Sequence, residues 1–196
     1  LNLTTEAFFG YSDLHGDVPT PPYVQATEAT KAGYQTIYAK HTGSVAAPTA
    51  GLHITDRLLE ALRQKGVHIV YVTLHVGIGT FRPMQDGDVA QHVMHSEWAH
   101  VPATTAERIH EAKAAGKRVI AIGTTATRAL EGAAQHTTPL REWSGFTNIF
   151  ITPGYTFRVI DGLMTNFHLP KSTLLVLVSA LLGRERTLAA YTHAIE

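Results

Sequence analysis

The sequence predicts a single α/β domain with a mixed, partly parallel sheet and flanking helices. Short apolar, β-branched runs alternate with helical patterns through the middle of the chain, which is typical of strands that pair in parallel. Hydrophobic residues make up 44% of the 196 residues, which is enough for a core and excludes intrinsic disorder. No linker or repeat divides the chain, so we assign residues 1–196 to one domain.

The first half is predicted to contain a loop, two strands and a helix. Glycine and proline punctuate residues 1–25, which predicts an extended loop leading into the domain. The β-branched and aromatic run 33–40 predicts a strand, as does the apolar run 67–76. Between them, Thr55 is the predicted N-cap of a helix that ends before Gly66.

The second half is predicted to alternate helices and strands. A capping box at Thr104 and Glu107 predicts a helix that ends before Gly116. The elements expected after it are a strand over 118–122, a helix from Gly123 to about Ala134, strands near 148–152 and 155–164 joined by Pro153-Gly154, an apolar helix from its cap Ser172 to Leu182, and a last helix from about Glu185.

Composition and charge exclude several classes of protein. Lys plus Arg and Asp plus Glu both number 16, so neither a strongly basic nucleic-acid binder nor a charged tail is expected. The absence of cysteine excludes disulfides, thiolate nucleophiles and cysteine-ligated metal centres. No apolar run approaches the roughly 20 residues of a membrane span, and no signal peptide is apparent. We expect a cytoplasmic protein and, because there is no initiator Met, a fragment of a longer chain.

Polar residues cluster where predicted strands end. Thr73 and His75 finish an apolar strand, and Gly77, Gly79, Thr80 and Arg82 follow; ligands of open α/β sheets bind beyond such strand ends. A tight turn is the alternative interpretation there. Thr124, Thr125 and Arg128 fall in the first turns of a predicted helix, where free N–H groups favour a carboxylate or phosphate. Ordinary capping by threonine is equally compatible with that pattern.

Two further segments carry titratable groups. In HVMHSEW, His95 and Glu97 share one face if the segment is extended, and they would then form a proton-transfer pair. A metal site is a weaker alternative because the spacing matches no zinc motif, and a surface histidine cluster is another. In TNFHLPKS, Asn166, His168 and Lys171 precede an apolar helix. The alternative interpretation is a plain turn, in which these polar side chains would have no role.

Five segments together resemble one enzyme family: YQTIYAKHTGSVAAPTAGLHIT, VTLHVGIGTFRPM, HVMHSEW, KRVIAIGTTATRALE and TNFHLPKSTLLVLVSA. In this order, they are similar to the signature segments of the S-adenosylmethionine:tRNA ribosyltransferase-isomerases of queuosine biosynthesis. The resemblance spans roughly residues 18–184. It departs mildly at Ile54, Ile78 and 126–127, where the family usually has Phe, Ala and Ser-Val.

The resemblance implies the C-terminal core portion of a longer family chain. The family fold is a mixed α/β core with a β-barrel domain inserted early, and this barrel and the closing segment are absent here. The implied enzyme acts on tRNA carrying 7-aminomethyl-7-deazaguanine at the wobble position. It transfers and isomerises the ribosyl part of S-adenosylmethionine, giving epoxyqueuosine and releasing adenine and methionine. S-adenosylmethionine is a co-substrate, and neither a metal, a redox cofactor nor a membrane is implied.

The chemistry then assigns roles to the clustered residues. We expect His95, Glu97 and His168 to transfer protons, with His53 and His75 as second choices. We expect Thr124, Thr125 and Arg128 to hold the methionine carboxylate, the glycine-rich turn to approach the nucleoside, and Arg82 and Lys171 to contact tRNA phosphate. The complete set expected to bind substrate is Thr49, His53, Thr73, His75, Gly77, Gly79, Thr80, Arg82, Thr124, Thr125, Arg128, Asn166 and Lys171.

Two other functions stay open at this point. A catalytically incomplete relative or fragment would bind tRNA without turnover, and its affinity would fall steeply with salt. An S-adenosylmethionine-dependent methyltransferase would also use a G-x-G turn at a strand end, but no other segment favours it. Release of adenine would exclude both.

Overall fold

A computed structural model of the chain describes residues 3–17, 20, 24–25, 27–28, 33–77, 84, 89 and 92–196. The chain divides into two compact units, Leu1–Tyr34 and Gln35–Glu196. All the strands of the described residues belong to the second unit.

The first unit contains a helix, α1 (Thr5–His15), where the sequence analysis predicts extended loop. The helix begins because the Oγ1 of Thr4 accepts a hydrogen bond from the backbone N–H of Ala7 at 3.2 Å. None of its residues is buried. The prediction was wrong because local capping, rather than a buried apolar stripe, starts this helix.

The second unit contains two small sheets. One is antiparallel with the order β1-β2-β4, formed by β1 (Thr73–His75), β2 (Glu97–Val101) and β4 (Trp143–Thr147). The other pairs β3 (Ile120–Ile122) with β5 (Gly162–Met164) in parallel, placing Ile122 opposite Met164. A mixed, partly parallel α/β fold is thus confirmed.

Several predicted strands differ from the observed ones. Residues 33–40 form turns rather than a strand, and only the end of 67–76 pairs as β1. The two strands predicted near 148–152 and 155–164 are also wrong in part, because β4 lies before them and only β5 falls within the second. Apolar, β-branched residues indicate that these runs are half-buried. Whether a run forms a strand also depends on a partner strand, which the local sequence does not reveal.

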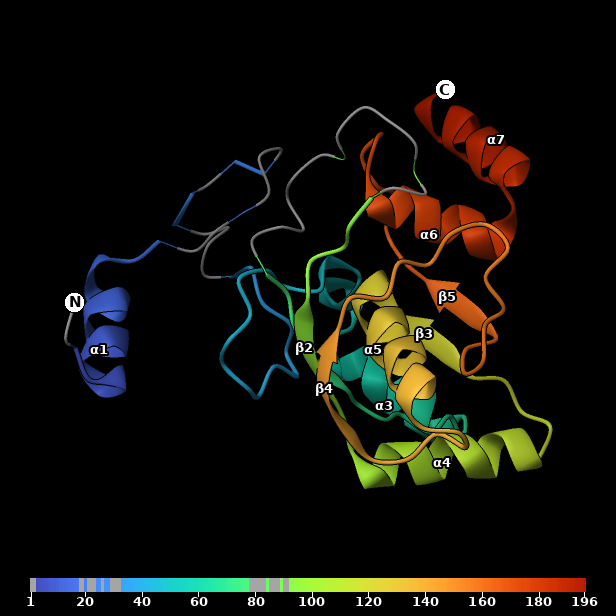
Figure 1. The fold of residues 1–196 in the computed structure, drawn as a ribbon, viewed down its shortest axis with the longest axis horizontal. Coiled ribbons are helices and arrows are strands. Elements are labelled where there is room, and N and C mark those ends of the chain that lie inside the picture. The colour runs from blue at the N-terminus through green and yellow to red at the C-terminus, as the bar shows by residue number, and fades with distance from the viewer. Residues whose placement is uncertain are drawn as a thin grey trace. The chain divides into compact units, whose positions relative to one another are not determined.

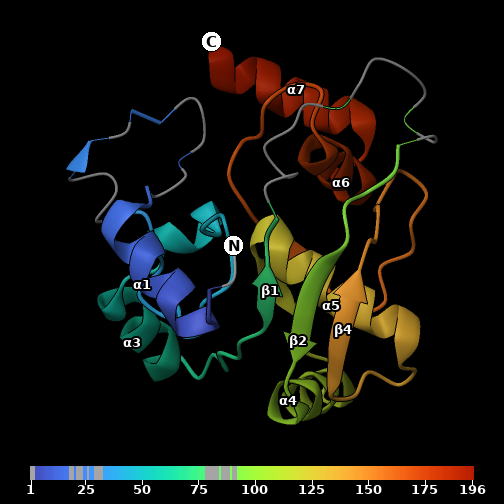
Figure 2. The ribbon, with the colours of Figure 1, turned by 60° about the vertical axis from the view of Figure 1, so that its left-hand side comes forward.

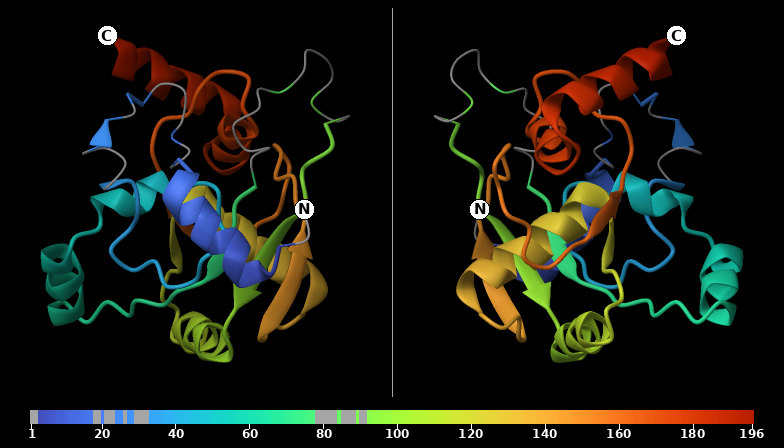
Figure 3. Two further views of the ribbon diagram at one scale, coloured as in Figure 1. Left: turned by 90° about the vertical axis from the view of Figure 1, so that its left-hand side faces the viewer. Right: turned by 90° about the vertical axis from the view of Figure 1, so that its right-hand side faces the viewer.

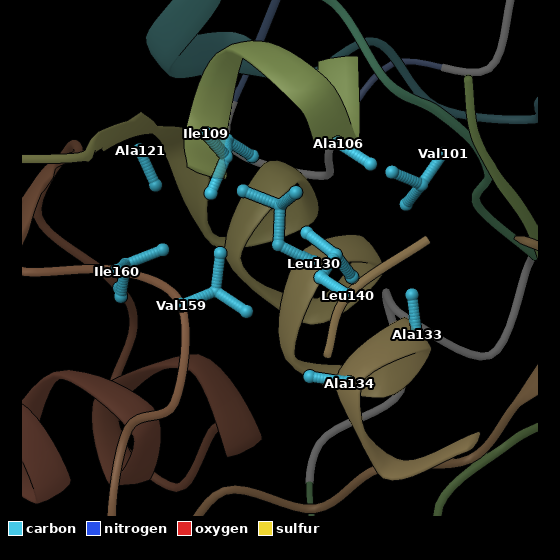
Figure 4. Packing of buried hydrophobic residues seen from close by; sticks show 10 residues of the cluster. All are labelled: Val101, Ala106, Ile109, Ala121, Leu130, Ala133, Ala134, Leu140, Val159 and Ile160. Carbon is cyan, nitrogen blue, oxygen red and sulfur yellow. The ribbon is translucent and has the colours of Figure 1, made fainter. Parts of the chain in front are cut away.

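Helix α5 (Gly123–His136) lies between the two sheets and contacts all five strands (Figure 1). Figure 2 shows it behind the face of the β1-β2-β4 sheet. Small residues let the strands approach closely: a Cβ on Gly132 would lie 2.5 Å from the Oγ1 of Thr147 in β4. Figure 4 shows the main core around this helix, formed by Val101, Ala106, Ile109, Ala121, Leu130, Ala133, Ala134, Leu140, Val159 and Ile160.

The other helices surround this centre. They are η1 (Thr49–His53), a 3₁₀-helix, followed by α3 (Asp56–Gln64), α4 (Ala103–Ala114), α6 (Thr173–Leu182) and α7 (Arg184–Ile195). Figure 3 shows α6 and α7 packed together at one end of the domain.

Side-chain caps explain where two of these helices start. The predicted caps are confirmed: Thr55 accepts from the N–H of Leu58, and Ser172 from that of Leu175, both at 3.2 Å. The predicted capping box is wrong, because α4 begins after Pro102, which provides no side-chain cap.

Candidate functional site

The carboxyl ends of β3 and β5 bring three signature segments together. Because these strands are parallel and in register, Gly123 and Thr165 follow them at the same edge of the sheet. The 3₁₀-helix η1 joins this edge: a Cβ on Gly123 would lie 3.6 Å from that of Ala50. The Nε2 of His53 lies 3.0 Å from the Oδ1 of Asn166, within hydrogen-bonding distance. The segments TAGLH, IGTTATR and TNFH therefore meet here.

A buried ion pair lies beside this edge. The Nη1 of Arg128, in α5, donates to the Oε2 of Glu97, at the start of β2. Their side chains are only 7% and 2% exposed. The Oε1 of Glu97 accepts from the backbone N–H of Gly77 at 3.1 Å. This carboxylate therefore links β2, α5 and the first glycine of the glycine-rich turn.

The ion pair corrects the expected pairing of His95 with Glu97. β2 begins at Glu97, and His95 is exposed in the irregular segment before it. Both oxygens of Glu97 already accept hydrogen bonds, one from Arg128 and one from Gly77. Two residues share a strand face only where both belong to the strand. The structure therefore pairs Glu97 with Arg128 and leaves His95 at the surface.

His75 and Thr73 lie on the other face of the β1-β2-β4 sheet. Leu74 is opposite Ala99 on the buried face that also carries Glu97, and His75 is opposite Trp98. The rings of His75 and Trp98 lie 4.9 Å apart. Because strand side chains alternate, His75 points away from the Arg128–Glu97 pair. The sheet thus separates residues that the sequence analysis assigned to one site.

The backbone before η1 fixes His75 in its position. Val45 donates to the carbonyl of Val76 at 2.9 Å, and the hydroxyl of Ser44 accepts from the N–H of Val76 at 3.0 Å. Gly43 has a φ of 133°, and a Cβ there would lie 2.7 Å from the His75 ring. Glycine is required at this position, both for its conformation and for the close approach. The Nε2 of His75 is buried and has no hydrogen-bond partner among the described residues.

His168 follows β5 and lies against α7. Its backbone N–H donates to the hydroxyl of Tyr191 at 2.7 Å, and its Nε2 lies 3.3 Å from the Oγ1 of Thr165. Burial lowers the pKa of His168 to about 4, because desolvation disfavours the charged ring. His168 is therefore neutral at pH 7.

The remaining predicted residues divide by position. Thr49 is half-buried in η1, Thr124 is buried and Thr125 half-buried in the first turn of α5, and Lys171 is exposed after β5. Lys171 has a φ of 55°, and its carbonyl accepts from the N–H of Met84 at 3.0 Å. Gly79, Thr80 and Arg82 lie outside the described residues.

The comparisons with known proteins agree with the sequence resemblance. Residues 2–196 match the family described as queuosine biosynthesis protein. The chain belongs to this family. An S-adenosylmethionine:tRNA ribosyltransferase-isomerase of Acaryochloris marina is 58% identical over 194 residues, which cover 99% of this chain and 52% of that protein. One of Trichormus variabilis is 56% identical over 93% of this chain and 45% of its own length.

A solved structure of the queuosine biosynthesis family shares the fold. The S-adenosylmethionine tRNA ribosyltransferase of Thermotoga maritima is 39% identical, with a TM-score of 0.61 over 74% of this chain and 46% of that one. The chain spans about half the length of the curated relatives it matches. The family resemblance drawn from the five sequence segments is confirmed.

Glu131 is a key residue of this family member that the sequence analysis missed. It is fully buried in α5. Its carboxylate accepts from the hydroxyl of Tyr155 and the backbone N–H groups of Arg158, Val159 and Ile160, at 2.9–3.1 Å. Burial and the Glu131 charge raise the pKa of Tyr155. The available signal was an acidic residue inside the small, apolar run ALEGAA.

Other kinds of site are not seen in the described part of this queuosine biosynthesis protein. Within it, no three His, Asp or Glu side chains are grouped to hold a metal ion. None of its helices is both long and apolar enough to span a bilayer. A hollow on α1 is lined by Leu3, Thr5, Phe8 and Phe9, and none of the predicted site residues contributes to it.

Proposed function

We propose that the full-length protein carrying this chain is an S-adenosylmethionine:tRNA ribosyltransferase-isomerase of the cytoplasm. It transfers and isomerises the ribosyl part of S-adenosylmethionine onto 7-aminomethyl-7-deazaguanine at the tRNA wobble position. The products are epoxyqueuosine in tRNA, adenine and methionine. The observation that carries this proposal is 58% identity over 99% of the chain to a relative of that name. S-adenosylmethionine serves as co-substrate, with no metal or redox cofactor.

The reaction needs a base, a nucleophile and a proton for the leaving group. The sulfonium acidifies the hydrogens on the ribose 5′ carbon, so a base that removes one leaves an ylide. The amine of the modified base attacks the anomeric carbon, and adenine takes up a proton as it leaves. Two or three groups that exchange protons near neutral pH meet this demand, together with dipoles that favour the charged intermediate.

His168 and His95 are our candidates for proton transfer. His168 is neutral at pH 7 because burial lowers its pKa, so its ring has a lone pair for a proton, and the same burial makes it a weaker base than an exposed histidine. His95 is exposed and keeps contact with solvent, which suits a group that returns protons to it. His53, hydrogen-bonded to Asn166, stays a second choice.

Glu97 serves the reaction by holding other groups in place. Its carboxylate bonds both Arg128 and the N–H of Gly77, which fixes the start of the glycine-rich turn against α5. Both oxygens of this carboxylate are already engaged by donor groups of the protein itself. We therefore move Glu97 from proton transfer to positioning.

The test is adenine release, measured by chromatography after mixing S-adenosylmethionine with precursor-bearing tRNA. We expect release by the full-length protein, and the 196-residue chain is assayed beside it. Salt-sensitive tRNA binding without adenine release would instead establish a binding protein. Formation of S-adenosylhomocysteine would establish a methyltransferase.

A further inference from the structure

Helix α5 begins with an uncompensated positive end. Its N-cap residue, Ile122, provides no side-chain hydrogen bond, and its first turn contains no acidic residue. The N–H groups of a first helical turn and the helix dipole favour an anion at this position. This feature alone does not define a site, because many helices begin without a side-chain cap.

Arg128 supplies a second, independent observation. Its guanidinium is planar, and only Nη1 is used in the ion pair with Glu97. Nε and Nη2 are both buried and have no hydrogen-bond partner among the described residues. Burying such donors without partners costs on the order of 1–3 kcal/mol each. The described residues therefore leave two buried donors of Arg128 without an acceptor, at a cost in stability.

These two nitrogen atoms form one edge of the guanidinium. The N–H bonds of Nε and Nη2 on that edge are nearly parallel, which matches the two oxygens of a carboxylate or phosphate. Side chains of a helix tilt toward its N-terminus, so Arg128 extends over the turn that contains Thr124 and Thr125. Arg128 and the first turn of α5 are therefore neighbours on one side of the helix.

We propose that the Nε–Nη2 edge of Arg128 binds the amino-acid carboxylate of S-adenosylmethionine, with Glu97 holding the guanidinium in the orientation that presents this edge. The inference rests on the proposed function. A small carboxylate suits the site better than a polymer phosphate, because the Arg128 side chain is only 7% exposed. Since both nitrogen atoms are buried, the residues that cover them must move when the ligand enters.

The charges of the ligand support this assignment. Arg128 and Glu97 neutralise each other, so a lone added carboxylate would leave a net negative charge in a buried place, which is unfavourable. S-adenosylmethionine brings its own ammonium and sulfonium charges beside the carboxylate. A zwitterionic amino acid with a cationic sulfur is therefore a better ligand than a simple anion.

Calorimetric titration of the full-length protein with two ligands tests the proposal. S-adenosylmethionine and its decarboxylated analogue share the nucleoside and sulfonium, and only the first has a carboxylate. We expect the analogue to bind at least about tenfold more weakly, the equivalent of about 1.4 kcal/mol. In Arg128→Lys this ratio falls toward one, because lysine keeps a cation for Glu97 but has no second edge.

A control variant and a competition experiment distinguish the possible outcomes. Arg108→Lys is the matched control, because Arg108 is exposed on α4 and bonds Glu111 at 2.6 Å; its ligand ratio stays that of the wild type. If the wild type binds both ligands equally, the inference about Arg128 is wrong and the proposed function is unaffected. This outcome can be measured even if Arg128→Lys does not fold. Binding of neither ligand contradicts the proposed function. Displacement of S-adenosylmethionine by millimolar inorganic phosphate, but not by methionine, assigns the edge to phosphate and overturns the carboxylate.

Discussion

At the scale of single residues, buried polar groups determine what this domain can do. Glu97 and Arg128 are 31 positions apart in sequence and pair inside the fold. Glu131 bonds residues that lie 24–29 positions further along. The residue types were visible in the sequence, but their partners depend on tertiary contacts. The sequence therefore named Glu97 and Arg128 as important, but it paired Glu97 with His95 instead of with Arg128.

Glu131→Gln is expected to destabilise the domain by about 3 kcal/mol. The amide has one acceptor oxygen, so at least one pair of donors among Tyr155, Arg158, Val159 and Ile160 would face an NH₂ group. Urea unfolding measures the change in the free energy of unfolding. Glu107→Gln, on the exposed face of α4, is the control and changes stability by less than about 0.5 kcal/mol. Equal effects of the two substitutions would contradict the role of Glu131.

His168 makes stability depend on pH. Its pKa is about 4 in the folded protein and about 6.5 in the unfolded chain, so between these values the unfolded state binds more protons. Stability is therefore fully present above pH 6.5 and is lost as the pH falls toward 4, by up to about 3 kcal/mol. In His168→Gln this part of the pH dependence disappears, as urea unfolding from pH 7.5 to 4.5 would show. An unchanged profile would refute the shift.

Catalysis gives a further prediction for the histidines. His95→Ala and His168→Ala in the full-length protein each lower turnover by about 10²-fold or more, the usual effect of removing a general acid or base. The measurement is the rate of adenine release with saturating tRNA. His193→Ala, exposed near the end of α7, is the control. Turnover within a few-fold of the wild type would remove both residues from the proposed catalytic set.

At the scale of elements, local signals predicted helices better than strands. Thr55 and Ser172 were predicted as caps and are caps, because an N-cap bonds within its own first turn. In residues 33–40, Tyr34 and Thr36 are buried while Gln35 and Ile37 are exposed, as in a half-buried strand. Their backbone nevertheless turns, since strand formation depends on a distant partner.

Close packing of α5 on β4 predicts an unusual response at Gly132. Alanine normally stabilises a helix interior by about 1 kcal/mol relative to glycine. Here its Cβ would lie 2.5 Å from the Oγ1 and 3.0 Å from the Cβ of Thr147. We therefore expect Gly132→Ala to destabilise the domain by about 1–3 kcal/mol, measured by urea unfolding. Because Thr147→Ala removes the nearest atom, the double variant should be less destabilised than the sum of the two single ones. Strict additivity would contradict the contact.

At the scale of the whole molecule, a parallel pair of strands and a central helix assemble the site. Parallel strands end at one edge, so the pairing of β3 with β5 brings the segments that follow them together. Which side chains of each strand face the core was not predictable, because a shift of one residue exchanges the two faces of a strand. For that reason His75 lies on the outer face although the sequence placed it with the rest.

In the proposed function, the balanced charge of this chain means that its own contribution to tRNA binding comes from local contacts. With 16 basic and 16 acidic residues, attraction to tRNA depends on individual cations near the site rather than on bulk charge. Lys171 is exposed and holds a φ of 55°, a conformation that costs a non-glycine residue about 1–2 kcal/mol. Such strain is typical of residues held in place for a ligand.

Lys171→Gln is therefore expected to weaken tRNA binding by the full-length protein and to change its salt dependence. Losing one phosphate contact lowers the slope of log Kd against log salt by about 0.7–0.9, which fluorescence titration at several salt concentrations measures. Lys171→Arg keeps the charge and the slope. Lys65→Gln, exposed at the end of α3, is the matched control for a general loss of charge. If Lys171→Gln and Lys65→Gln leave the same slope, Lys171 does not contact phosphate, and the cations that bind tRNA lie elsewhere in the full-length protein.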